Sequence, residues 1–264
     1  MLRKAALGAI IQPLYADKLQ ATLALDIHAP VDTDTVLNHS GRVPGRESRP
    51  ERVAPARLQR RAMNTVEGRA TLLHALAHIE MNAVDLALDI VWRFAGMPEP
   101  FYREWATVAR EEAYHFNLLN QHLHSLGYAY GDFPAHQSLW EMAEKTRDDL
   151  LARLALVPRT YEARGLDVTP GIRDKLKQAG DARAAEILDI ILRDEIGHVE
   201  IGNRWYKTLC AQRGLDPIDT YPLLSKQYNA PLIRGPFNFE ARRQAGFTEA
   251  ELDALLVLAE EKKP

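Results

Sequence analysis

A near absence of cysteine sets the first limit on this chain, because Cys210 is the one cysteine among 264 residues. A single thiol excludes an internal disulfide framework and any metal centre held by several cysteines, such as a rubredoxin-type iron site. The opening segment MLRKAALGAIIQPL has two basic residues before a short apolar run, but Gln12 and Pro13 interrupt that run and no small-residue cleavage site follows. We therefore expect a cytoplasmic protein.

Three other features are weak or missing. No stretch approaches the roughly 20 apolar residues that span a bilayer, so no membrane partner is expected. The formal net charge of -3 is too small to indicate wholesale wrapping of nucleic acid. Runs of alternating β-branched residues between turns are almost absent, so strands should contribute little to the fold.

Helical periodicity is strong instead. The pattern predicts one or two short helices over 3–27, long helices over 64–96, 99–127, 137–165 and 181–214, a short helix after Pro170, and a closing helix over 248–261. The stretch NTVE offers an N-cap at Asn64 for the first long helix, and Pro158 is expected to kink the third. Residues 28–62 and 215–245 are rich in proline and are expected to be irregular.

These elements predict an all-α protein with a four-helix bundle over 63–214. N-terminal helices and an Arg-rich extended arm over 1–62 precede the bundle. An extension over 215–264 follows it and is expected to pack on it.

One six-residue pattern occurs twice, as REEAYH and, 83 residues later, as RDEIGH. Residues three apart share a helix face, so Glu112 points with His115, and Glu195 points with His198. Apolar residues occupy the same two faces at helical spacing. Each Glu–His pair therefore interrupts a stripe that should face the core, which argues against an ordinary surface pair.

Two further carboxylates fit this pattern. Glu80 lies on an apolar helix face, where an ionised carboxylate without a partner is costly. The 32 positions from Glu80 to Glu112 are nearly repeated by the 33 positions from Glu162 to Glu195. Glu162 follows from this spacing, and Glu141 and Glu144 remain competitors on the same predicted helix.

Four carboxylates and two imidazoles would then meet inside the bundle, from Glu80, Glu112, His115, Glu162, Glu195 and His198. The negative charge of four carboxylates balances two divalent cations. Oxygen-rich ligation with two histidines favours iron or manganese over structural zinc. A Glu from each of two helices and a Glu-x-x-His from each of the other two form the ligand pattern of di-iron and di-manganese carboxylate bundles.

On these residues the chain resembles the ferritin-like di-metal superfamily, and most closely a bacterial ferritin-like family of unknown function. Glu80, EEAYH, Glu162 and DEIGH carry the resemblance, which extends over nearly the whole chain and includes PGRESRPERV and GPFNFEARRQAGF. The resemblance implies a di-metal site and no particular substrate. The wider superfamily includes oxygen-activating hydroxylases, a tRNA-modifying hydroxylase, rubrerythrin peroxidases and ferritin iron stores.

The acids that directly precede two ligands, Glu111 and Asp194, point off the ligand face. We expect each to accept the second ring N–H of a ligand histidine on a neighbouring helix and so to orient that ring. The alternative is a solvated acid or a pair with the preceding arginine, Arg110 or Arg193.

The favoured function is an oxygen-activating oxidase or hydroxylase that acts on an unknown substrate. Cys210 alone cannot form a redox relay, so an external electron donor or the substrate would supply electrons. A non-enzymatic ferroxidase or storage role is one alternative. The extra segments outside the bundle argue against a cage subunit, and a monomer or small homo-oligomer is expected.

A second alternative, a tRNA- or nucleotide-modifying hydroxylase, rests on the Arg-rich arm. Arginines of such an arm could dock RNA or another phosphate ligand. More often an arm of this kind packs along a bundle, with each arginine paired to a local acid. The arginines concerned are Arg42, Arg46, Arg49, Arg52, Arg57, Arg60 and Arg61.

Overall fold

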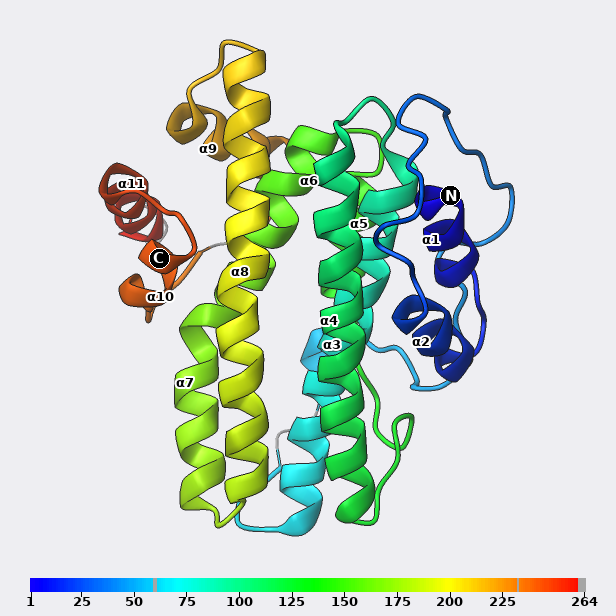
Figure 1. Cartoon of the computed structure of the whole chain (residues 1–264). Coiled ribbons are helices and arrows are strands. Elements are labelled where there is room, and N and C mark those ends of the chain that lie inside the picture. The colour runs from blue at the N-terminus through cyan, green and yellow to red at the C-terminus, as the bar shows by residue number, and fades with distance from the viewer. Residues whose placement is uncertain (59–60, 232, 261–264) are drawn as a thin grey trace. The chain divides into compact units, whose positions relative to one another are not determined.

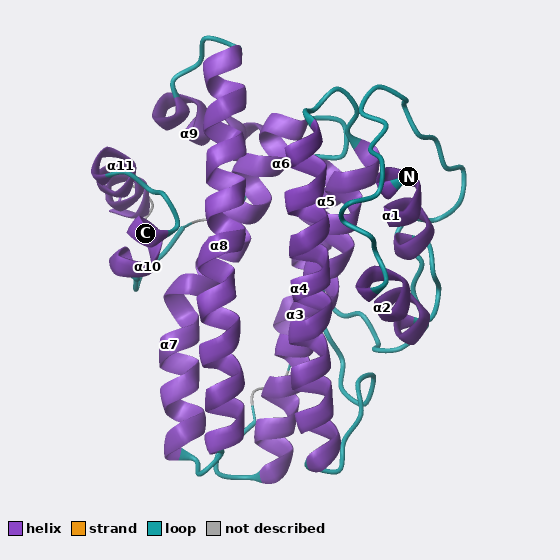
Figure 2. Cartoon of the chain, viewed as in Figure 1, coloured by secondary structure: helices purple, strands orange, loops and turns teal. Residues whose placement is uncertain are grey.

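The computed structural model describes residues 1–58, 61–231 and 233–260 (Figure 1). Over these residues the protein is all-helical, with loops between the helices (Figure 2), no β-strand and one isolated β-bridge between Arg52 and Ala135. None of the described helices is both long enough and apolar enough to cross a membrane. The predicted all-α class is confirmed, whereas the ferritin-like bundle and the division near residues 62 and 214 stay predictions.

The chain divides into two compact units. Unit 1 comprises Met1–Trp140 and Ala179–Ile187, and unit 2 comprises Glu141–Gln178 and Leu188–Pro264. Both units share α5 (Ser138–Lys145) and α8 (Ala182–Gln212), because each of these helices begins in unit 1 and ends in unit 2.

Unit 1 is built around two long helices. Apart from the shared helices α5 and α8, the elements of unit 1 are α1 (Leu2–Ile10), α2 (Tyr15–Leu23), the 3-10 turn η1 (Pro55–Arg57) and the two long helices α3 (Val66–Arg93) and α4 (Glu99–Ser125). The long helices α3 and α4 pack against each other, α1 packs mainly on α3, and α2 packs on α4. The helices predicted over 3–27, 64–96 and 99–127 are therefore confirmed. The N-cap of α3 is Thr65 and not Asn64, because the Thr65 hydroxyl accepts the Gly68 N–H at 3.0 Å.

A buried arginine ties α1 to the end of α3. The Arg3 residue is 1% exposed, and its Nε and Nη2 donate to the carbonyls of Val91 and Trp92 at 3.2 and 3.0 Å. Its Nη1 donates to the carbonyls of Asp32 and Thr35 at 2.7 and 2.8 Å. The last carbonyls of a helix lack intrahelical donors and carry partial negative charge, which suits a guanidinium. Arg3 thus anchors both α1 and the irregular segment after α2.

The Arg-rich arm is joined to α3 by a buried ion cluster. Lys18 of α2 and Arg46 of the arm both bind the carboxylate of Asp85, at 2.5 and 3.0 Å, and the Asp85 side chain is 1% exposed. Arg46 also donates to Asn82 Oδ1 at 2.7 Å and to Gln137 Oε1 at 3.0 Å. Arg46 therefore follows the packing alternative, in which an arginine of the arm pairs with a local acid.

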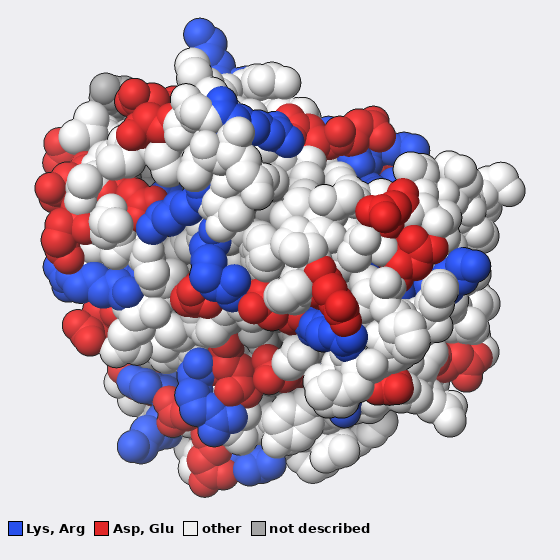
Figure 3. All heavy atoms as spheres, turned by 45° about the horizontal axis from the view of Figure 1, so that its top comes forward, with Lys and Arg blue, Asp and Glu red and all other residues white. Residues whose placement is uncertain are grey.

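Other arginines of the arm also have contacts inside unit 1. Arg52 donates to the carbonyl of Glu47 at 2.8 Å, and Arg61 forms an ion pair with Glu67. Arg60 lies outside the described residues. Acidic and basic side chains are interspersed on the molecular face in Figure 3. RNA or phosphate docking by the arm stays a prediction.

Unit 2 contains the remaining helices, of which α7 and α8 are the longest. The elements are α6 (Leu150–Leu156), the π-helical segment η2 (Val157–Glu162), α7 (Ala163–Gln178), α8 from Leu188, α9 (Pro217–Gln227), α10 (Phe239–Gln244) and α11 (Glu249–Glu260). Helix α7 runs beside α8 (Figure 1), and Arg173 donates to Asp189 across them at 3.0 Å. Their shared core is made of Ala163, Leu166, Val199, Ala241, Ala245, Phe247 and Leu252.

The predicted third helix over 137–165 is wrong as a single element, because the chain forms α5, α6 and η2 there. The carboxylate of Asp149 accepts the Ala152 N–H at 3.2 Å and so starts α6 as a new helix. Pro158 has no amide hydrogen, and at this position the chain passes into the wider turn of η2. Pro158 therefore marks a change of helix type, where a kink was predicted.

The short helix predicted after Pro170 is also wrong, because α7 runs through this proline. A proline within a helix frees the carbonyl four residues earlier, here that of Leu166. Asn238 Nδ2 donates to this carbonyl at 3.2 Å, which supplies the missing hydrogen bond. The segment predicted as coil over 215–245 contains α9 and α10. The predicted closing helix is observed as α11, and its expected last residue, Glu261, lies outside the described residues.

Gly202 of α8 allows a close approach to η2, and this contact gives a testable prediction. A Cβ atom at Gly202 would lie 2.6 Å from Pro158 Cβ. Although Gly→Ala inside a helix usually stabilises, Gly202→Ala should lower the free energy of unfolding by about 1–3 kcal/mol because of this overlap. Gly197→Ala is the control, because a Cβ there would meet no described atom within 4 Å. Chemical denaturation of both variants checks the prediction, and equal effects would contradict it.

Candidate metal centre

Two carboxylates and an imidazole meet inside unit 1. Glu80 comes from α3, and Glu112 and His115 come from α4. Each offers one possible ligand atom, and these atoms lie within 4.8 Å of one another. His115 Nδ1 is 3.4 Å from Glu112 Oε2 and 3.5 Å from Glu80 Oε2. The structure therefore brings together the three ligands predicted on the first two long helices.

All three groups of this cluster are removed from solvent. Glu80 is 5% exposed, and Glu112 and His115 are fully buried. Their neighbours on the same helices include the buried apolar residues Ala77 and Phe116, as the interrupted stripes predicted. Buried carboxylates are retained where a partner or an ion compensates their desolvation.

The electrostatics of the cluster suit a cation. Burial raises the pKa of Glu80 well above its ordinary value, and the nearby Glu112 carboxylate raises it further. Burial opposes the charged form of His115, but hydrogen bonds and attraction to the two carboxylates outweigh it and raise the His115 pKa. A metal ion could replace the protons that this cluster otherwise holds.

Unit 2 carries the second Glu–His pair on α8. His198 is 1% exposed, and its Nδ1 lies 3.7 Å from Glu195 Oε1. The Glu195 side chain is 12% exposed, and its Oε2 accepts no hydrogen bond within the described part of the chain. Glu162 is half-buried and is the last residue of η2. Glu195 and His198 lie close together, as predicted from their spacing. That Glu162 joins them as a metal ligand stays a prediction.

The two acids expected to orient histidines have different surroundings. Asp194 accepts hydrogen bonds from Arg193 Nε at 2.8 Å and from Arg193 Nη2 at 3.2 Å. The alternative pairing with the preceding arginine is thus present for Asp194, although the Arg193 side chain is 71% exposed. Glu111 is half-buried on α4. The orienting role of both acids stays a prediction.

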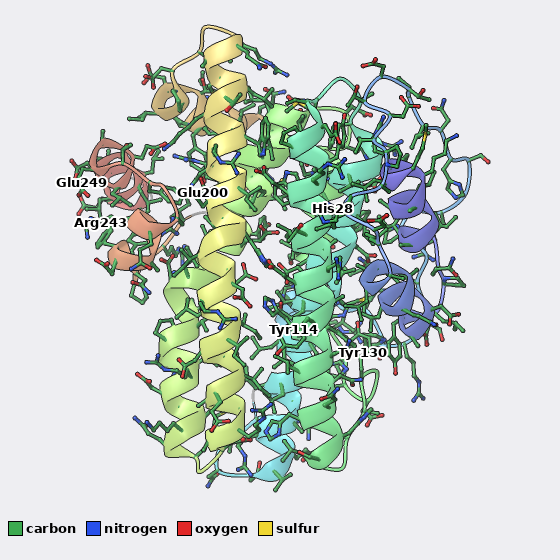
Figure 4. All side chains as sticks on the ribbon, viewed as in Figure 1. His28, Tyr114, Tyr130, Glu200, Arg243 and Glu249 are labelled. Atoms are coloured by element: carbon green, nitrogen blue, oxygen red, sulfur yellow. The ribbon has the colours of Figure 1, made fainter. Side chains whose placement is uncertain are left out.

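Two residues close in sequence to the cluster of Glu80, Glu112 and His115 have side chains outside it. Tyr114, labelled in Figure 4, directly precedes His115 but is 46% exposed. His78 lies two residues before Glu80, and its Nδ1 is 2.7 Å from the hydroxyl of Tyr130, a residue that packs edge-on against Tyr15 of α2. His78 therefore faces the N-terminal segments of unit 1.

Comparison with known proteins places the chain in a family. A family model described as "Protein of unknown function (DUF455)" matches residues 9–253. The chain belongs to this family. A curated Haemophilus influenzae protein, described as an uncharacterized protein, is 51% identical over 212 residues, which cover 78% of this chain and 74% of that relative. No solved structure gives a significant match. The family match includes all six predicted metal ligands.

Proposed function

We propose that the chain is a ferritin-like di-metal carboxylate protein that acts as an oxygen-activating oxidase or hydroxylase on an unknown substrate. The observation that carries this proposal is the buried cluster of Glu80, Glu112 and His115, with a nitrogen and two carboxylate oxygens close together. In the proposed site, Glu162, Glu195 and His198 supply the other three ligands.

The donor set supports iron or manganese as the bound ions. Carboxylate oxygens and imidazole nitrogens suit these metals, whereas structural zinc sites use four tetrahedral ligands that commonly include cysteine. The second Glu-x-x-His pair, Glu195 with His198, repeats the residue types of Glu112 with His115. This repetition supports a site of two ions over a site of one.

The bound metals would supply oxygen activation and oxidation of the substrate. The protein's own part is to hold the ligands in a dry interior, as burial of Glu112 and His115 already does. Cys210 is buried, and burial raises the pKa of its thiol. With no second cysteine in the chain, reducing electrons would come from a partner protein or from the substrate.

Metal analysis and oxygen uptake test this proposal. Protein purified from cells supplied with iron and manganese should contain about two metal ions per chain. When ferrous iron is added in excess, the reduced protein should consume dioxygen. After desalting, it should keep about two irons per chain and elute as a monomer or small oligomer. Retention of many more irons in a large particle would favour storage. Absence of bound metal under these conditions would refute the site.

A further inference from the structure

A cavity of about 360 Å³ lies wholly within unit 2. This volume is in the range of pockets that bind small organic ligands. Its walls come from η2, from the start of α7, and from α9, α10, α11 and the segments that join them. The proposed metal ligands do not line it, so it calls for a separate explanation.

One wall of the cavity is apolar. Tyr221, Phe247 and Leu255 line it and are buried at 8, 6 and 7% exposure. Ile218 of α9 and Leu258 of α11 extend the same wall. A ligand with an apolar body would be stabilised there in proportion to the apolar area removed from water, at about 25 cal/mol per Å².

The polar part of the lining is dominated by arginine. Arg159, Arg164, Arg234 and Arg242 line the cavity, against the single acid Glu251. Two of the arginines are balanced by buried acids. Arg242 binds Asp167 through two hydrogen bonds of 2.9 and 2.8 Å, and Arg159 binds Glu251 at 2.9 Å.

The other two arginines leave an excess of positive charge. Arg164 lies 3.5 Å from Asp167, which Arg242 already binds, and Arg164 also donates to the carbonyl of Arg234 at 2.8 Å. Arg234 is exposed and forms no ion pair with any described acid. Glu251 is further neutralised by Lys207, at 2.9 Å. The lining and its direct partners thus favour a negatively charged group.

Aromatic rings hold Arg159, one of the residues that line the pocket. The Arg159 guanidinium lies 4.6 Å from the ring centre of Phe247 and 5.0 Å from that of Tyr206. Its Nη1 donates to Asn203 at 2.7 Å. A side chain held by two ring contacts and by hydrogen bonds at Nη1 and Nη2 loses little freedom when a ligand binds, which favours affinity.

We propose that this pocket binds a small amphipathic acid. The apolar body of the ligand packs on Phe247, Leu255 and Ile218, and its carboxylate or phosphate group is held by Arg234 and Arg164. The inference rests on the pocket alone and requires no metal. The segment η2 nevertheless joins the two features in the chain, because Thr160 and Tyr161 line the pocket and Glu162 follows directly.

Calorimetric titration of the whole chain with four probes tests the ligand class. Decanoate and decyl phosphate carry the two acid groups, and decanol and decylamine are the neutral and cationic counterparts with tails of matched length. At least one of the two acids should bind more tightly than decanol and decylamine, and the tighter acid identifies the preferred headgroup. If neither acid binds more tightly than decanol, or if no probe binds, the proposal is overturned.

Two pairs of variants locate the binding. Arg234→Ala should weaken acid binding about tenfold or more, as expected for a lost charged hydrogen bond. Arg213→Ala is its control, an exposed arginine of the same unit that does not line the cavity. Ala254→Trp fills the cavity from α11, and Val257→Trp places the same ring at a 54% exposed position of that helix. Undiminished binding in both Arg234→Ala and Ala254→Trp would place the ligand elsewhere and refute the proposal.

Discussion

Replacement of Glu112 by alanine is expected to reduce the metal content from about two ions per chain to about one or none. The Glu112 carboxylate is fully buried and lies 3.4 Å from His115 Nδ1, so no solvent-exposed group can take its place at the cluster. The metal-free variant should fold and be at least as stable as the metal-free parent, because one of two nearby buried carboxylates is gone. Elemental analysis and thermal unfolding of both apo proteins check the two halves of this prediction.

Asp194→Asn is the matched comparison for Glu112→Ala. Asp194 precedes the proposed ligand Glu195 and binds Arg193, so its replacement should leave both expected metals in place. If Asp194→Asn loses metal as completely as Glu112→Ala, the division between ligands and neighbouring acids is incorrect. Circular dichroism of each variant shows whether the helices remain formed, so a folding defect is recognised separately from a loss of ligand.

Replacement of Asp85 by alanine is expected to destabilise the protein by about 3–5 kcal/mol, because the change leaves two buried cations without their shared anion. Lys18 and Arg46 both bind Asp85, and the Lys18 side chain is 3% exposed. Burial lowers the pKa of Lys18, and Asp85 is the group that opposes this effect most strongly. Denaturant titration measures the loss of stability.

Two controls separate the ion cluster from a general effect of lost charge. Asp17→Ala removes an exposed carboxylate from α2 and should cost less than about 1 kcal/mol. A triple variant, Lys18→Met with Arg46→Leu and Asp85→Leu, removes all three charges together and should recover much of the stability lost in Asp85→Ala. A triple variant as unstable as the single one would show that packing, and not unbalanced charge, explains the loss.

The parts of the fold that could be predicted were those with local signals. Helix α4 agrees with its prediction to within two residues, because local signals mark both of its ends. Pro98 directly precedes the helix, and Gly127, whose φ is +85°, follows it. The cluster of Glu80, Glu112 and His115 was predictable because polar residues at helical spacing interrupt apolar stripes. The period of the apolar residues shows which face of a helix is buried, and this was enough to predict that Glu80, Glu112 and His115 face the core.

The parts that could not be predicted depend on contacts distant in sequence. Helix α7 passes through Pro170 because Asn238, 72 residues from Leu166, bonds the carbonyl that the proline frees. The start of α6 at Asp149 is hidden in a continuous helical pattern, and only the cap reveals it. The acid-binding pocket of unit 2 was missed because its walls include α9 and α10, in a segment whose prolines suggest coil.

The anchoring of Arg3 also constrains the order in which the protein can fold as it is synthesised. Arg3 leaves the ribosome well before its acceptors, because the carbonyls of Val91 and Trp92 lie 88 and 89 residues later in the chain. At ordinary rates of translation this interval lasts on the order of ten seconds. During that time Leu2 and Ile10, both fully buried in the finished protein, have no α3 to pack against. The N-terminal helices therefore wait for α3, and a nascent chain stalled before residue 91 would present an apolar segment that chaperones can bind.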